Sequence, residues 1–253
     1  MPRTCGTKTL VALPEDSNKM KFVYTGPSWA ASSYPVGHKS TNLAKEWGMP
    51  YLDYSMPGSN VLSRLALVDT VKSLPIVWVY HEPIGCLTEA TGLSKEQLIQ
   101  RSDWRDVWED CNQFCLRAIN DLNRPVLLIG AHSDIVNCNY KNITVAHPSW
   151  QKFLAHQAGM PIKDNTVSVK MDDGGDFFVS TCWGAEVLHR FMHENPHITP
   201  SAEVTNAVWD IFFFWKELEK ADLFFEVHPN HRGNKLFAEQ LTPTVIKFLQ
   251  DNQ

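Results

Sequence analysis

Short apolar runs alternate with longer amphipathic segments along this chain. Each run has the length and composition of a strand that is buried on both faces. The segments between them carry apolar residues at the spacing of helices that pack on one side. This alternation predicts an α/β domain, a three-layer α/β/α sandwich around a central, mostly parallel sheet. The runs are residues 21–25, 51–54, 75–79 and 124–130.

Helical spacing and capping residues place the predicted helices. The segment from Val61 to Ser73 is predicted to be helical, with Leu62, Leu65 and Val68 at helical spacing. A less regular stretch at about 135–199 contains a predicted hairpin and is a candidate insertion or cap within one domain that spans 1–253. The other predicted helices cover residues 94–98, 103–122, 201–220 and 234–249.

Composition excludes several classes of protein. The chain has 253 residues, of which 43% are hydrophobic and 20% charged, and these are values of an ordinary globular domain. The net charge of −5, without a basic run, predicts no nucleic-acid partner. No apolar run is long enough to span a membrane, and residues 1–13 lack the apolar core of a signal peptide. We therefore expect a cytoplasmic protein without a membrane partner.

The cysteines are predicted to be thiols. The chain has six of them, at spacings that match neither a metal knuckle nor a small disulfide scaffold. Cys111 and Cys115 are four residues apart on a predicted helix, which is the spacing of core positions. The sequence also lacks a phosphate-binding loop and a dinucleotide glycine motif, so we expect no cofactor.

The most specific motif lies near the C-terminus, where the residues from His228 to Gly233 are H-P-N-H-R-G. Near the other end, Ser28 follows the first predicted strand directly after Gly26 and Pro27. Together these segments resemble the SGNH (GDSL-like) hydrolases, which carry the catalytic histidine in an H-P-N-x-x-G-type segment and the nucleophilic serine just after the first strand. The resemblance implies a flavodoxin-like sheet, Ser28 as nucleophile and His228 as general base.

Two further segments resemble the family in order and spacing. Gly58 corresponds to the glycine whose backbone N–H serves the oxyanion hole with the N–H of Ser28, and His81 stands where the family has an asparagine donor. The family aspartate precedes the histidine by three residues, but Phe225 occupies that position here. Glu226 is the nearest carboxylate that could orient His228.

The chemistry explains why these residue types are needed. A serine hydroxyl is a weak nucleophile at neutral pH, so a neutral histidine must accept its proton during attack on an acyl carbon. The resemblance therefore implies an SGNH-type esterase or carbohydrate O-deacetylase that works through a Ser28 acyl-enzyme. The implied substrate is a small ester or an acetylated carbohydrate, and the sequence does not choose between them.

Two other functions remain open from the sequence. The substitution at His81 and the displaced carboxylate Glu226 would also suit a non-catalytic SGNH-like binding or structural module of a larger assembly. A metal-dependent hydrolase would use histidines, although no H-E-x-x-H spacing supports a metal site. The candidates are His132 with Asp134, His147, His228 and His231. The oligomeric state is left open as well.

Overall fold

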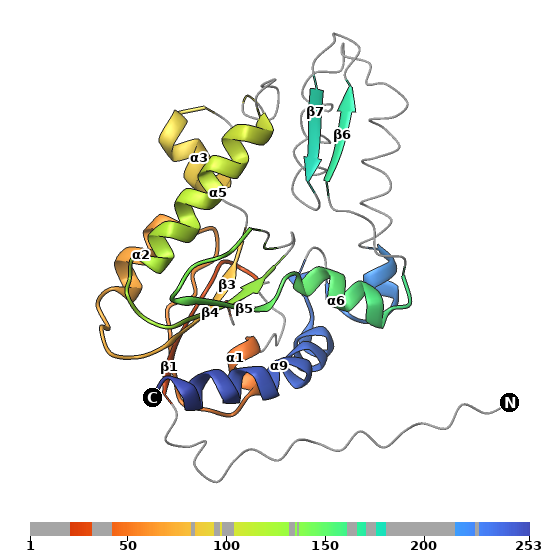
Figure 1. The fold of residues 1–253 in the computed structure, drawn as a ribbon. Coiled ribbons are helices and arrows are strands. Elements are labelled where there is room, and N and C mark those ends of the chain that lie inside the picture. Colours follow the sequence, from red (N-terminus) through yellow and green to blue (C-terminus); the bar gives the residue numbers. More distant parts are fainter. Residues whose placement is uncertain are drawn as a thin grey trace, which may run out of the picture.

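A five-stranded parallel sheet forms the centre of the molecule (Figure 1). The computed structural model describes residues 21–31, 42–81, 84–93, 97, 104–131, 135, 137–160, 166–170, 176–180, 216–225 and 228–253. The strands are β1 (Phe22–Thr25), β2 (Tyr51–Asp53), β3 (Ile76–Tyr80), β4 (Val126–Gly130) and β5 (Ile143–His147).

The strand order is β2-β1-β3-β4-β5, and all the pairs are parallel. This is the flavodoxin-like order, in which the chain changes direction across the sheet between β1 and β3. Ligands of such sheets bind at this switch point, beyond the carboxyl ends of the strands. The order confirms the fold class expected from the sequence and makes the ends of β1 and β3 the place to look for a site.

Every residue of β1, β3 and β4 is buried, because helices cover both faces of the sheet. Successive side chains of a strand point to opposite faces, so each strand contributes to two separate cores. Val77 and Val79 belong to one core, whereas Ile76, Trp78 and Tyr80 belong to the other. The three layers therefore follow directly from the continuous apolar runs.

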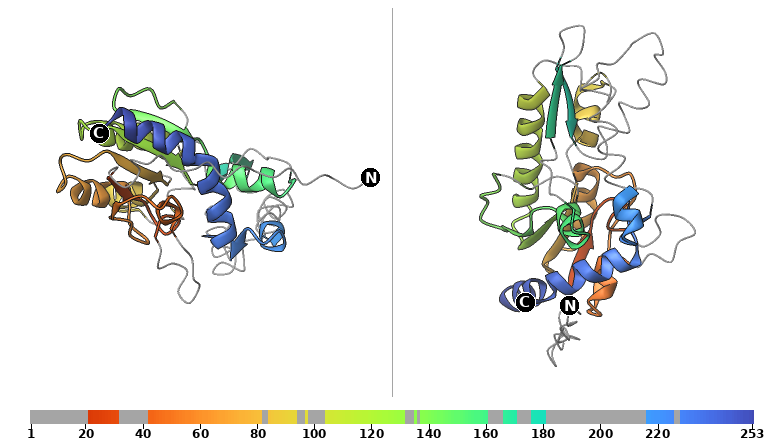
Figure 2. Two further views of the ribbon diagram at one scale, coloured as in Figure 1. Left: turned by 90° about the horizontal axis from the view of Figure 1, so that it is seen from below. Right: turned by 90° about the vertical axis from the view of Figure 1, so that its right-hand side faces the viewer.

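Helices from distant parts of the chain cover the two faces (Figures 1 and 2). The first face packs against α1 (Leu43–Glu46), α6 (Trp150–Gln157) and α9 (His231–Asp251). The second face packs against α2 (Val61–Val68), α3 (Ile84–Thr91) and α5 (Trp104–Asn120).

Several elements differ from the sequence-based expectation. Helix α2 ends at Val68 rather than residue 73, because tight turns follow, in which Thr70 N–H and Val71 N–H donate to Leu67 O and Val68 O. Strand β5 and helix α6 lie within the predicted insertion, yet they belong to the central sheet and its core. The insertion was therefore predicted to begin too early, and for the part of the chain after α6 it stays a prediction.

The predicted hairpin is present as β6 (Thr166–Lys170) and β7 (Asp176–Ser180), an antiparallel pair outside the central sheet (Figure 1). A second antiparallel pair, β8 (Phe224–Phe225) and β9 (His228–Pro229), leads into α9. Residues 216–220 are helical at the end of the helix predicted for 201–220, and the earlier part of that prediction lies outside the described residues. Among the described residues, no helix is long and apolar enough to cross a membrane.

Candidate active site

The turn that carries Ser28 depends on a glycine. Pro27 O accepts a hydrogen bond from Ala30 N–H at 2.9 Å, so the chain makes a single helical turn immediately after β1. A Cβ on Gly26 would lie 2.5 Å from Ala30 Cβ and 2.8 Å from Val79 Cβ on β3. Only glycine lets this turn fold back so closely onto β3, and Ser28 is left half-buried at its start.

His228 is positioned by the short β8–β9 pair and by the start of α9. His228 lies opposite Phe225 in the antiparallel register. Asn230 caps α9, because its side-chain oxygen accepts from Gly233 N–H at 2.9 Å while its own N–H donates to Leu223 O at 3.0 Å. A Cβ on Gly233 would lie 2.3 Å from Leu223 O, so this glycine permits the helix to start against the chain before β8. Asn230 and Gly233 of the H-P-N-x-x-G motif thus each have a structural role at the start of α9.

An aromatic cluster joins the two segments. Trp29, directly after Ser28, packs edge-on against Phe224 of β8 with ring centroids 5.5 Å apart. Trp29 also packs edge-on against Trp150 of α6, at a centroid distance of 5.6 Å. Both tryptophans are almost completely buried. These contacts hold the serine turn against the strand pair that carries His228.

The structure brings Ser28 and His228 together although they are 200 residues apart in sequence. Ser28 Oγ and His228 Nε2 lie 2.9 Å apart, within hydrogen-bond reach. His228 is only 6% exposed, and this burial lowers its pKa to about 4, with a further lowering from the charge of His81. The imidazole is therefore neutral at neutral pH, and in the Nδ1–H tautomer its Nε2 accepts a hydrogen bond from the Ser28 hydroxyl.

The other predicted site residues stand in different relations to this pair. His81 directly follows β3, is half-buried, and is close enough to act electrostatically on His228. Gly58 is exposed in the loop after β2 and has a positive φ of 71°. That loop continues the pairing of β2 with β1, because Met56 N–H donates to Gly26 O at 3.0 Å. Glu226 lies outside the described residues, so its role as the orienting carboxylate stays a prediction.

Sequence reasoning missed Arg64, which is completely buried on α2. Its Nη1 donates to Ser59 O at 3.0 Å and to Ser59 Oγ at 3.1 Å, so it holds the residue next to Gly58. Its guanidinium lies 5.6 Å from the ring centre of Trp78, and burial lowers its pKa to about 10. The available signal was its spacing with Val61 and Val68, which are also buried on α2.

The described residues contain no group of three or more histidine, cysteine or acidic side chains arranged to hold a metal ion. His132 and Asp134, two of the residues considered for a metal-dependent reaction, lie outside the described residues.

Comparison with known proteins gives a distant structural likeness. No protein-family model matches the chain, and no curated protein matches it. The crystal structure of protein YxiM from Bacillus subtilis is similar with a TM-score of 0.41 and 9% sequence identity, over 90% of this chain and 56% of that one. The chain thus spans little more than half the length of YxiM. At this TM-score the likeness carries no argument about function, and the fold assignment rests on the strand order.

Proposed function

We propose that this protein is a serine hydrolase that cleaves ester bonds through a Ser28 acyl-enzyme, with His228 as general base. The observation that carries the proposal is the 2.9 Å contact between Ser28 Oγ and His228 Nε2. A buried, neutral imidazole beside a half-buried serine hydroxyl is the arrangement that nucleophilic acyl transfer requires. Its position beyond β1, at the switch point of the sheet, agrees with where such folds bind ligands.

In the proposed reaction, Ser28 Oγ attacks the acyl carbon of the ester while its proton passes to His228 Nε2. The carbonyl electron pair moves onto the acyl oxygen and forms a tetrahedral oxyanion. When this intermediate collapses, the ester C–O bond breaks and the leaving alkoxide takes the proton from His228. Water then attacks the acyl-enzyme by the same route, which releases the acid and restores Ser28.

Donors near Ser28 would stabilise the oxyanion. The resemblance to SGNH hydrolases assigns this role to the backbone N–H groups of Ser28 and Gly58. His81 takes the position of the family asparagine and can donate from a ring N–H. Losing one such donor typically costs about 3 kcal/mol of transition-state stabilisation. Glu226 is the proposed carboxylate that fixes the tautomer of His228.

The resemblance suggests either a small ester or an acetylated carbohydrate as substrate. Both present an acyl group on an alcohol oxygen, and the proposed mechanism is the same for each. An acetyl ester is therefore the first substrate to try, followed by acetylated sugars.

Reaction with a fluorophosphonate probe, followed by intact mass, tests the proposal. We expect one adduct on the wild-type protein and none on Ser28→Ala. Ser63→Ala is a matched control, because Ser63 is an exposed serine in the first turn of α2 whose hydroxyl donates to Asn60 O. This control should label like wild type.

Two results would contradict the proposal. An adduct that persists in Ser28→Ala would place the reactive group elsewhere. The absence of any adduct on the folded wild-type protein would favour the non-catalytic binding or structural module instead.

A further inference from the structure

The loop between β2 and α2 carries Gly58 in a tight turn that closes from Met56 to Ser59. Ser59 N–H donates to Met56 O at 3.2 Å, and Ser59 Oγ donates to the same carbonyl at 2.5 Å. Pro57 takes the second position of this turn, where its ring fixes a negative φ, and Gly58 takes the third with a φ of 71°. These are the residues and the backbone geometry of a type II turn, whose third position requires a positive φ.

The turn itself does not use the N–H of Gly58. Its closing hydrogen bond takes the N–H of Ser59, and within the described part of the chain no backbone carbonyl accepts from Gly58. The same loop is bonded to the serine turn, because Met56 N–H donates to Gly26 O at 3.0 Å. The donor that the proposed function assigns to the oxyanion is therefore available, and its loop is tied to the residue two positions before Ser28.

Arg64 holds the last residue of this turn from the core. Its Nη1 donates to Ser59 O at 3.0 Å and to Ser59 Oγ at 3.1 Å, so one donor fixes both the backbone and the side chain of Ser59. Arg64 is completely buried on α2, and its guanidinium lies 5.6 Å from the ring centre of Trp78 on β3. A side chain packed in a dense interior keeps one position, so Arg64 fixes the turn relative to the central sheet.

Stability alone does not explain an arginine at this position. Its Nε and Nη2 have no hydrogen-bond partner among the described residues, and buried donors without partners are costly. An apolar side chain of similar volume would avoid that cost. What the arginine provides, and an apolar side chain would not, is the pair of hydrogen bonds to Ser59. Local costs of this kind are typical of functional sites.

We propose that Arg64 is a positioning residue that acts through Ser59 to hold the N–H of Gly58 towards the oxyanion, an inference that rests on the proposed function. Negative charge develops on the acyl oxygen only as Ser28 attacks, so a donor that is already fixed stabilises the transition state without reorganisation. A small displacement of that donor slows the reaction. Arg64 therefore contributes to kcat and leaves the binding of the unreacted ester unchanged.

Steady-state hydrolysis of p-nitrophenyl acetate by the full chain tests this positioning role. In Arg64→Met, kcat should fall by about tenfold while KM stays the same, because the lost interaction matters only in the transition state. Arg64→Lys keeps a donor and should recover part of kcat. Ser59→Ala removes one of the two acceptors of Nη1 and should also lower kcat, by less than Arg64→Met. Ser63→Ala is the matched control, because Ser63 Oγ donates to Asn60 O outside the turn, and it should hydrolyse like wild type.

Amide hydrogen exchange gives a second readout that does not depend on activity. The N–H of Ser59 is protected by its hydrogen bond to Met56 O, so it should exchange faster in Arg64→Met than in wild type. The amides of β3 and β4 should exchange as in wild type, which would show that the loss is confined to the turn. Unchanged exchange of Ser59 N–H in Arg64→Met would show that Arg64 does not hold the turn.

The kinetic results separate this inference from the proposed function. A wild-type kcat in folded Arg64→Met would overturn the positioning role and leave the hydrolase function standing. If the wild-type protein neither hydrolyses the ester nor reacts with the fluorophosphonate, the hydrolase function fails and the role of Arg64 in catalysis fails with it. If Arg64→Met does not fold, Arg64→Lys and Ser59→Ala decide the question, and a wild-type kcat in both would overturn the inference.

Discussion

Helix α2 is held near each end by a buried arginine, and the two arginines are held in different ways. At the C-terminal end, Arg124 donates through Nη1 to Val68 O at 2.8 Å and through Nε to Leu74 O at 3.0 Å, and its Nη2 donates to Leu74 O as well. At the N-terminal end, Arg64 bonds only to Ser59 among the described residues, through Nη1 alone. One guanidinium is thus satisfied by carbonyls, whereas the Nε and Nη2 of the other have no hydrogen-bond partner among the described residues.

The two arginines lie towards opposite ends of the parallel sheet, and their hydrogen bonds differ accordingly. Arg124 precedes β4 and joins the chain segments that enter the sheet, where nothing in the proposed reaction takes place. Arg64 lies below the loop that leaves β2, on the side where Ser28 and His228 meet. Arg124 uses its donors on backbone carbonyls, whereas Arg64 donates to Ser59, next to Gly58 in the proposed oxyanion loop. Variants at the two ends should therefore separate stability from reactivity.

The largest effect is expected at the carboxyl end of the sheet, from His228→Gln. Glutamine cannot accept the Ser28 proton, so the fluorophosphonate labelling rate should fall by about 10²–10⁴-fold. The unfolding free energy should change much less, because glutamine is neutral like the buried imidazole. Labelling kinetics and urea unfolding of the same samples measure both quantities. Labelling at the wild-type rate would remove His228 from the mechanism.

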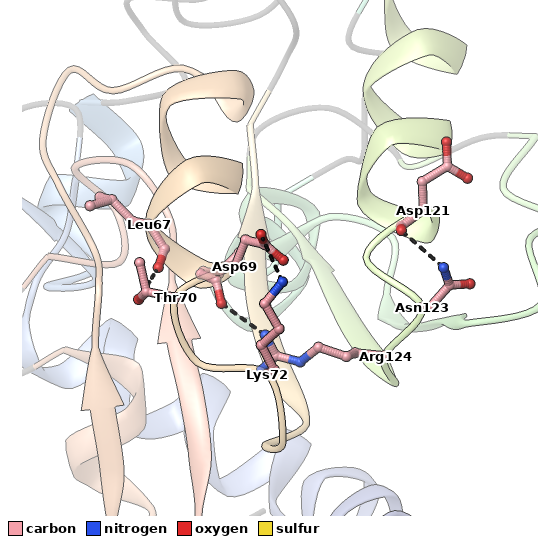
Figure 3. A network of polar contacts seen from close by, with 8 residues as sticks. Leu67, Asp69, Thr70, Lys72, Asp121, Asn123 and Arg124 are labelled. Atoms are coloured by element: carbon pink, nitrogen blue, oxygen red, sulfur yellow. Dashed lines mark hydrogen bonds and ion pairs between the residues drawn. The ribbon is translucent and has the colours of Figure 1, made fainter.

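The opposite result is expected at the other end, from Arg124→Met. The carbonyls of Val68 and Leu74 would lose their donors in a buried place, so the unfolding free energy should fall by about 3 kcal/mol. The labelling rate of the folded protein should stay unchanged. Lys72→Met is the surface control in the same region (Figure 3), because the pair of Lys72 with Asp69 is exposed and contributes well under 1 kcal/mol. An unchanged midpoint for Arg124→Met would show that this arginine does not hold α2.

Acidification should affect the carboxyl end through His228. The pKa of His228 is lowered from 6.5 to about 4 in the folded protein, so between these values the unfolded chain binds more protons. Stability is therefore complete above pH 6.5 and falls as the pH decreases towards 4, by roughly 3 kcal/mol at most. The labelling rate should keep its plateau down to about pH 4, where His228 gains its proton. Urea unfolding across this range should be less pH-dependent in His228→Gln.

His81 offers a check on the cause of that low pKa. Burial is the larger cause and the charge of His81 the smaller. In His81→Gln, the labelling rate should therefore begin to fall at a higher pH than in wild type, but still below pH 6.5. If the labelling rate of the variant falls at the same pH as that of wild type, His81 does not act on His228.

Much of this arrangement was predictable from the sequence, because the relevant residues carry local signals. The runs that became β1, β3 and β4 are continuous and apolar, which only a strand covered on both sides requires. The capping residue Asn230 and the close approach of Gly233 explain why the H-P-N-x-x-G segment could be recognised. The prediction that Ser28 and His228 share a site agrees with their 2.9 Å contact, and their catalytic role stays a proposal.

What the sequence did not predict depends on neighbours far along the chain. Strand β5 has only one buried residue, Ile143, because it is an edge strand, so it lacks the apolar signal of the others. The apolar positions of α2 suggested that Leu62 and Leu65 face the core, but Val61, Arg64 and Val68 are the buried residues. The local sequence does not explain why an arginine occupies a buried position of α2. It becomes understandable only with Trp78 beside its guanidinium and with Ser59 as its hydrogen-bond acceptor.

The smallest effect is expected from Arg64→Met, and it sharpens the comparison with Arg124. Replacing a buried charge that makes few hydrogen bonds by an apolar side chain of similar size costs little stability, so the unfolding free energy should change by less than about 1 kcal/mol. Ser59 would lose its donor, and the labelling rate at Ser28 should fall by about tenfold. Arg64→Lys, which keeps a donor and a charge, should recover part of the rate.

The labelling rate at Ser28 separates a positioning role of Arg64 from a merely structural one. Arg124→Met should leave that rate unchanged, because Arg124 lies at the other end of α2. If both variants lost stability equally and neither altered the chemistry of Ser28, the two arginines would be equivalent clamps, and the difference between their hydrogen bonds would have no functional meaning.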